Sequence, residues 1–179
     1  MSTAMNEIAS WNDRVQDLED KLNKMKREMV EPFTELLVKL IKEELFDKYQ
    51  VEKVFWTQYT PYFNDGEACE FSVQEKACVV IGDEDACDYE GSILYYTSME
   101  DLQKDLNHPT YGWYRSNAKD ALEVSKLEPN YFELVKTWRK IARVMDNIST
   151  DIYLFAFGDH VKVTIVRDGE IEIDEYDHD

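Results

Sequence analysis

Apolar residues recur along the first part of the chain at alternating intervals of three and four, with polar and charged residues between them. This spacing is that of the a and d positions of a heptad repeat, which place one narrow apolar row along a helix. The row consists of Ile8, Trp11, Val15, Leu18, Leu22, Met25 and Met29. We expect a helix from about residue 4 to about residue 31, roughly 40 Å long at about 1.5 Å per residue. Twice the radius of gyration expected for a compact chain of this size is only about 32 Å, so the helix either projects and self-associates or packs on its own domain.

The charges beside this row leave both alternatives open. In a parallel pair of helices, Arg14 of one chain would face Glu19 of the other, which is favourable. In the same arrangement Lys21 would face Lys26, which is unfavourable. The row is therefore a candidate oligomerisation surface for a homodimer, with packing on the protein's own domain as the alternative.

Pro32 marks the predicted start of a second helix, because a proline in the first turn lacks only a donor that the helix does not use. This helix should run to about Lys48, and its apolar residues form a broad face that predicts burial in a core. They are Phe33, Leu36, Leu37, Leu40, Ile41, Leu45 and Phe46. We divide the chain accordingly into a helical arm, residues 1–31, and a single domain, residues 32–179.

Strand-like alternation begins after this helix. We predict strands at Val51–Tyr59, Glu67–Gln74, Ala77–Ile81 and Ile93–Thr97, with a turn at Asn64-Asp65-Gly66. Helices should follow from a Ser98 cap to about Leu106, from about Asn117 to Leu127, and from an Asn130/Glu133 capping pair to about Asn147. A three-strand meander of Asp151–Phe157, His160–Val166 and Glu170–Tyr176 is expected to end the chain. Helices and strands are segregated, with helices between the halves of a mostly antiparallel sheet, which predicts an α+β fold.

Two stretches carry a resemblance. Residues 55–66 read FWTQYTPYFNDG, and the end of the chain combines Phe157-Gly158-Asp159-His160-Val161, Arg167-Asp168-Gly169 and Tyr176-Asp177-His178-Asp179. Both resemble a family of uncharacterised proteins encoded by tailed phages and bacteria. The resemblance implies a small phage-type accessory protein; the family has no assigned activity, so it implies no catalytic residue.

The aromatic residues of the first motif have two interpretations. Tyr59, Tyr62 and Phe63 either cover the edge of the sheet or form an exposed surface that a partner recognises. Aromatic side chains make good anchors in protein interfaces, so we include these three among the candidate partner-binding residues.

The net charge of -18 bears on function more than on fold. Half of it lies in residues 49–115, where acids exceed bases by nine. Such a charge repels nucleic acid and anionic lipid and attracts basic surfaces. One loop of this region holds the other candidate partner-binding residues, which are Asp83, Glu84, Asp85, Asp88 and Glu90.

No stretch of the sequence approaches the roughly 20 apolar residues that span a bilayer, and the N-terminus lacks the features of a secretory signal. Cys69, Cys78 and Cys87 are odd in number and spaced unlike zinc ligands, which favours small buried thiols. We expect a cytoplasmic protein, in the host cytoplasm if it is phage-encoded.

Candidate chemistry is sparse. Asp159, His160, Asp177 and His178 could form a mixed nitrogen and oxygen metal site if the last strands bring them together. The acidic loop lacks the glycine of an EF-hand, and the chain has neither a nucleophile elbow nor a glycine-rich phosphate loop. We therefore expect no cofactor and do not favour an enzyme.

The predicted helix at residues 130–147 places four cations opposite its apolar face. Lys136, Arg139, Lys140 and Arg143 could pair with the protein's own acids, remain solvated or hold an anion.

These features lead to three functional hypotheses. The first is an acidic accessory protein that binds and blocks a basic surface of a host defence or nucleic-acid-processing protein, as an imitation of DNA would. The second is a small metal-dependent hydrolase or nuclease. The third is an immunity protein against a basic toxin.

Overall fold

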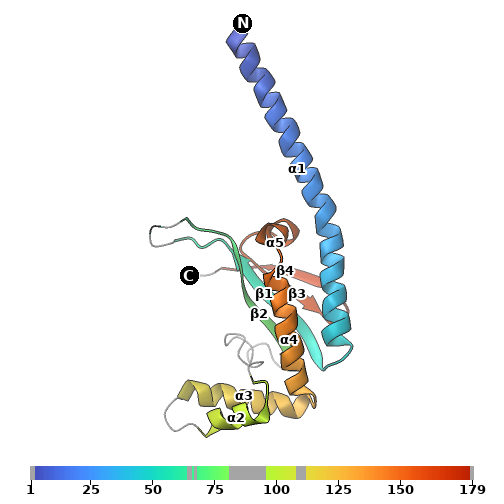
Figure 1. The fold of residues 1–179 in the computed structure, drawn as a ribbon, viewed down its shortest axis with the longest axis vertical. Helices are drawn as coiled ribbons and strands as arrows, with labels where there is room; N and C mark the ends of the chain where they lie inside the picture. The colour runs from blue at the N-terminus through green and yellow to red at the C-terminus, as the bar shows by residue number, and fades with distance from the viewer. Residues whose placement is uncertain (1–2, 64–65, 67, 81–95, 108–111, 178–179) are drawn as a thin grey trace.

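The computed structural model describes residues 3–63, 66, 68–80, 96–107 and 112–177. The elements in chain order are α1 (Thr3–Ile41), the π-helix η1 (Lys42–Phe46), β1 (Val51–Tyr59), β2 (Ser72–Val80), α2 (Met99–Leu106), α3 (Gly112–Leu127), α4 (Tyr131–Asp146), α5 (Thr150–Phe157), β3 (Val161–Val166) and β4 (Ile171–Glu175). All strands pair antiparallel in one sheet of order β2-β1-β3-β4. The predicted α+β fold, with a long N-terminal helix and helices between the sheet halves, is confirmed (Figure 1).

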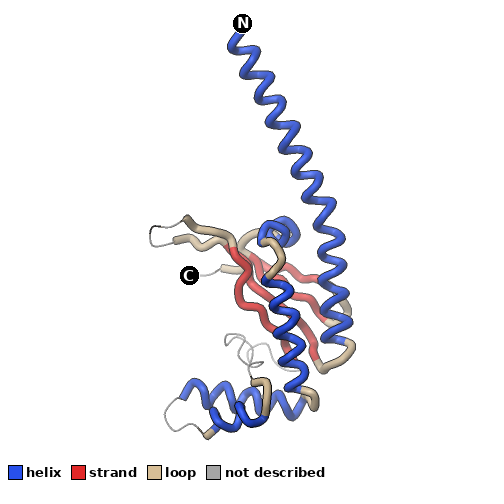
Figure 2. Tube along the Cα trace, in the orientation of Figure 1, coloured by secondary structure: helices blue, strands red, loops and turns tan. Residues whose placement is uncertain are grey.

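One face of the sheet carries the core. Val54 pairs with Ile165 and Trp56 with Val163, and all four side chains are fully buried. Their β-branched and aromatic side chains suit a pleated surface that packs against helices. Figure 2 shows α4 lying over the strands, and α5 contributes aromatic rings to the same core.

α1 runs unbroken through Pro32, so the predicted start of a second helix at this proline is wrong. A proline inside a helix removes one backbone hydrogen bond and costs about 3 kcal/mol or more. Packing on the C-terminal side of the proline offsets this cost, because Leu37 and Ile41 are buried in the core. η1 continues the helix and buries Leu45 and Phe46 as well.

An arginine from the β3–β4 hairpin fixes the end of η1 and the start of β1. The guanidinium of Arg167 donates hydrogen bonds to the carbonyl oxygens of Phe46, Tyr49 and Val51 at 2.5, 3.2 and 2.7 Å. These bonds occupy carbonyl groups near a helix end, where intrahelical donors are missing. Gly169, with φ of +95°, then turns the chain into β4.

The predicted strand Asp151–Phe157 is wrong, because these residues form the helix α5. A short apolar run does not distinguish a strand from a buried helix by periodicity alone. Tyr153 and Phe157, four residues apart, lie on one helical face and are buried against Trp56 at ring-centroid distances of 6.0 and 5.3 Å. Gly158, with φ of +97°, ends the helix in a conformation that glycine adopts readily. The predicted meander therefore reduces to the β3–β4 hairpin.

The predicted helices between the sheet halves are present. Ser98 caps α2, and its Oγ accepts a hydrogen bond from the backbone N–H of Asp101 at 3.2 Å. α3 begins at Gly112 rather than near Asn117. The helix predicted at residues 130–147 is α4.

A buried carboxylate holds the corner between α3 and α4. The Asn130 side chain makes no capping hydrogen bond, contrary to the predicted capping pair. Glu128, only 2% exposed, instead accepts the backbone N–H groups of Asn130 and Gln50, both at 2.7 Å. This carboxylate thus joins the start of α4 to the start of β1.

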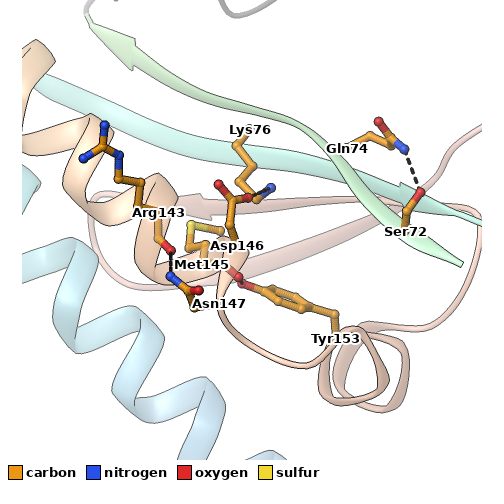
Figure 3. A network of polar contacts seen from close by, with 8 residues as sticks. All are labelled: Ser72, Gln74, Lys76, Arg143, Met145, Asp146, Asn147 and Tyr153. Carbon is orange, nitrogen blue, oxygen red and sulfur yellow. Dashed lines mark hydrogen bonds and ion pairs between the residues drawn. The ribbon is translucent and has the colours of Figure 1, made fainter.

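β2 is one strand where two were predicted, and its pairing with β1 contains irregularities. Lys76 on β2 forms an ion pair of 2.6 Å with Asp146 at the end of α4 (Figure 3). In the same region the Tyr153 hydroxyl donates a hydrogen bond to the carbonyl oxygen of Met145 at 3.1 Å. The predicted strand Ile93–Thr97 lies mostly outside the described residues.

Candidate interaction surfaces

The apolar row of α1 is exposed to solvent. The first part of this helix extends away from the rest of the molecule (Figure 1). Ile8, Trp11, Leu18, Leu22, Met25 and Met29 each expose between 50% and 67% of their surface, and Val15 is half-buried. The alternative that the row packs on its own domain is therefore wrong for most of its length. Contiguous exposed apolar surface of this kind marks interaction sites in soluble proteins.

The exposed row continues beyond Met29. Leu36 lies seven residues after Met29 and is 66% exposed, although we expected it in the core with its neighbours. Leu37 is 3% exposed, and successive residues of a helix point about 100° apart. α1 therefore carries two adjacent apolar faces, one in the core and one in solvent. The signal for Leu36 was the unbroken heptad spacing across Pro32.

α5 supports α1 beside the exposed row without covering it. The ammonium of Lys26 lies 3.8 Å from the centroid of the Phe155 ring, a cation–π contact. Met29, Val30, Ile152 and Phe155 line a mostly apolar depression of about 240 Å³ next to this contact. Apolar surface on the rest of the molecule after α1 (residues 42–177, called the body below) thus adjoins the row on the helix.

The two motifs that carry the family resemblance meet in a second surface, at the end of β1. The side chain of Asp159 accepts hydrogen bonds from the backbone N–H and the hydroxyl of Thr60, both at 2.8 Å. The Tyr62 ring stacks on His160 with centroids 4.8 Å apart, and the Tyr59 ring lies 5.8 Å from that of Tyr176. We call Tyr59, Thr60, Tyr62, Asp159, His160 and Tyr176, together with the adjacent Phe63, the aromatic corner.

Of the three predicted aromatic anchors, two are presented to solvent. Tyr62 is 67% exposed and Phe63 is 80% exposed, whereas Tyr59 is half-buried beside Tyr176. The aromatic corner is thus fixed at its base by Asp159 and presents the aromatic rings of Tyr62 and Phe63 to solvent.

Asp159, one of the four residues of the predicted metal site, is already held by hydrogen bonds within the protein. Burial raises the pKa of its carboxyl group, but the hydrogen bonds from Thr60 and from the backbone N–H of His160 outweigh burial and lower the pKa below its ordinary value. Both carboxylate oxygens are engaged by Thr60. Asp177 is exposed, and His178 lies outside the described residues. Within the described ranges, no group of three or more His, Cys, Asp or Glu side chains is placed to hold a metal ion.

Six exposed acids lie close together in sequence on the β3–β4 hairpin and the residues after it. Asp168, Glu170, Glu172, Asp174, Glu175 and Asp177 are all exposed, and no basic residue interrupts residues 168–177. β4 is an edge strand, and charge on such a strand prevents unwanted pairing with other strands. The predicted acidic loop with Asp83, Glu84, Asp85, Asp88 and Glu90 lies outside the described residues. Cys69, expected as a buried thiol, is exposed.

The four cations of α4 are exposed on the side of the helix away from the core, as their spacing predicted. Lys136 pairs with Glu133 of the same helix at 2.7 Å. In Figure 3 the guanidinium of Arg143 points away from Asp146 and Asn147.

The chain was compared with protein-family models, with curated proteins and with solved structures, and none of them matches it. No helix in the described part of the chain is long and apolar enough to cross a membrane.

Proposed function

We propose that this is a non-catalytic binding protein that self-associates through α1 and docks its acidic body on a basic protein. The observation that carries the proposal is the apolar row of α1, which is exposed over four heptads from Ile8 to Leu36. Removing such a row from water is favourable in free energy, and a second helix is the surface that fits it.

Charge supports the class of partner. Residues after 48 carry 15 of the 18 net negative charges, so the body presents a strongly negative field. Such a field attracts basic surfaces and raises the rate at which they associate. Strongly basic surfaces are typical of proteins that bind nucleic acid.

The aromatic corner supplies anchors that charge alone does not. Tyr62 and Phe63 stand exposed on a base fixed by Asp159 and Thr60. The same residues belong to the motifs that resemble the phage family, which favours a surface used by an accessory protein in a host cell. The proposed role is therefore to occupy and block the nucleic-acid-binding surface of a host protein in the cytoplasm.

Self-association is tested by removing the arm. A variant that lacks residues 1–24 keeps Lys26 on Phe155 and retains the whole core. It should be a folded monomer by light scattering and circular dichroism, whereas the full chain should dimerise below about 100 µM. A full chain that stays monomeric at 100 µM contradicts the proposed association.

Docking is tested by capture from host lysate with competition. Immobilised protein should retain a basic protein that is released by salt and by duplex DNA. Salt screens the attraction between the two proteins, and DNA occupies the basic surface of the partner. The matched control replaces Glu170, Glu172, Asp174 and Glu175 with their amides. If capture is insensitive to salt, DNA and these amides, the proposed acidic docking is wrong.

A further inference from the structure

We infer that the second copy binds α1 antiparallel, in one register, with Trp11 of each chain against Leu36 of the other. The inference rests on the proposed association through α1 and adds its direction and alignment. In an antiparallel pair each a residue packs on a d residue of the other helix, while g faces g and e faces e. This alignment layers Trp11 on Leu36, Val15 on Pro32, Leu18 on Met29 and Leu22 on Met25, each twice by symmetry.

The flanking charges select this alignment. Arg14 then faces Glu35 of the second copy, and Lys21 faces Glu28. On the other flank, Glu19 faces Lys26. Every charged pair along the overlap is attractive, and symmetry doubles each of them.

The neighbouring antiparallel registers bring like charges together. A shift of one heptad toward the N-terminus makes Lys21 face its own copy and Glu19 face its own copy. A shift in the other direction does the same for Glu28 and Lys26. Like charges across a coiled-coil flank are destabilising, so one alignment stands out.

The parallel arrangement is disfavoured on two grounds. It opposes Lys21 with Lys26, and it places both acidic bodies at the same end of the coil. In the antiparallel alignment the two bodies lie along opposite halves of the coil, because each body contacts its own α1 at Lys26 and beyond. They are therefore farther apart than in a parallel pair, in which they lie side by side.

The structure leaves this surface open. Leu36, Lys39 and Glu43, the last positions along which the second helix would run, are exposed. Within the part of the chain that the structure describes, Arg14, Glu19 and Glu35 make no ion pair, so their charges are available to a second copy.

One charge reversal distinguishes the two directions. Lys21→Glu replaces two attractive pairs with Glu28 by two repulsive ones in the antiparallel dimer, and should raise its dissociation constant about tenfold. In a parallel dimer the same change replaces Lys21–Lys26 repulsion by attraction and tightens binding. Sedimentation equilibrium measures both outcomes.

The matched control is Lys24→Glu. Lys21 and Lys24 each pair with an acid four residues away in the same helix, Asp17 and Glu28 respectively. Lys24 occupies a c position outside the flanks, so its reversal should change dimerisation by less than about twofold.

Mixing completes the test. Lys21→Glu and Glu28→Lys chains should each self-associate weakly, but together they form a heterodimer with attraction restored at both pairs. Tighter binding of Lys21→Glu alone, or no preference on mixing, overturns the antiparallel register while leaving self-association intact. A wild-type chain that never dimerises overturns the proposed association itself.

Discussion

α4 and the first half of α1 are both amphipathic helices, yet they end in opposite surroundings. The apolar face of α4 is buried, with Tyr131, Leu134, Val135, Trp138, Ile141 and Met145 all in the core. The apolar row of α1 lies in solvent. The difference is in the width of the apolar face rather than in its hydrophobicity.

α4 has pairs of adjacent apolar residues two turns apart, Leu134-Val135 and Ile141-Ala142, which make a face broad enough to cover a sheet. The row of α1 follows strict intervals of three and four and is one residue wide. A broad stripe is typical of a helix in a globular core, whereas the narrow a/d stripe is the seam of a coiled coil. The width of an apolar face thus indicates what will cover it.

Two tryptophans provide the strongest test of this comparison. Trp138 is 5% exposed and Trp11 is 67% exposed. Trp138→Ala should lower the free energy of unfolding by about 3–5 kcal/mol, because it leaves a cavity in the core. Trp11→Ala should change the same quantity by less than about 0.5 kcal/mol when measured on the monomer. Urea unfolding at low protein concentration gives both values, and equal losses would mean that Trp11 packs on its own domain.

The buried carboxylate of Glu128 positions α4, and changing it should have the next largest effect on stability. Glu128→Gln keeps the size of the side chain but replaces one carboxylate oxygen by an NH₂ group. This group would face a backbone N–H, so that two donors meet and one hydrogen bond is lost. We expect a loss of roughly 2 kcal/mol in the free energy of unfolding, as for other hydrogen bonds to a charged group. Glu133→Gln, on the exposed side of α4, is the control and should cost less than about 1 kcal/mol. Equal effects of the two changes would contradict the anchoring role of Glu128.

The sequence was sufficient for the fold class and for most elements, because their periodicity is long and regular. α4 and the β3–β4 hairpin are examples. It failed where local signals compete with packing. Pro32 indicates a helix start, but the buried side chains beyond it, such as Leu37, keep the helix continuous. The run Asp151–Phe157 fits a strand equally well until Trp56 is there to receive Tyr153 and Phe157.

The candidate surfaces were predictable to different degrees. The heptad row followed from spacing alone, whereas its exposure depended on where α5 packs. The aromatic corner needed the fold, because Thr60 and Asp159 are 99 residues apart in sequence and meet only through β1 and β3. Leu36 was assigned to the wrong face because its neighbours Phe33 and Leu37 belong to the core.

A smaller effect is expected at the base of the aromatic corner. Asp159→Ala removes the acceptor of two hydrogen bonds from Thr60 and should cost about 1 kcal/mol at neutral pH, given its partial exposure. Because the folded pKa of Asp159 is lowered, its contribution is present above the unfolded value near 3.8 and is lost as pH falls through the folded value. The free energies of unfolding of the unchanged protein and of Asp159→Ala, measured with urea, should therefore converge in strong acid. Thr60→Val and the double variant test the coupling between the two side chains, and fully additive losses would contradict the contact.

The smallest effect is expected on the outer face of α4, and it separates a solvated charged face from an interface. Lys136, Arg139, Lys140 and Arg143 are exposed there, and Lys136 already pairs with Glu133. A surface that attracts a basic partner must present continuous negative charge, since like charges across an interface are costly. These cations should therefore lie outside the interface.

Replacing all four with glutamine should change partner affinity by less than about threefold, or about 0.65 kcal/mol, by calorimetry. The variant with amides at Glu170, Glu172, Asp174 and Glu175 is the control, and it should weaken the same complex more. If binding instead collapses when the cations are removed, α4 holds an anion, and the proposed acidic docking gives way to an anion-binding function.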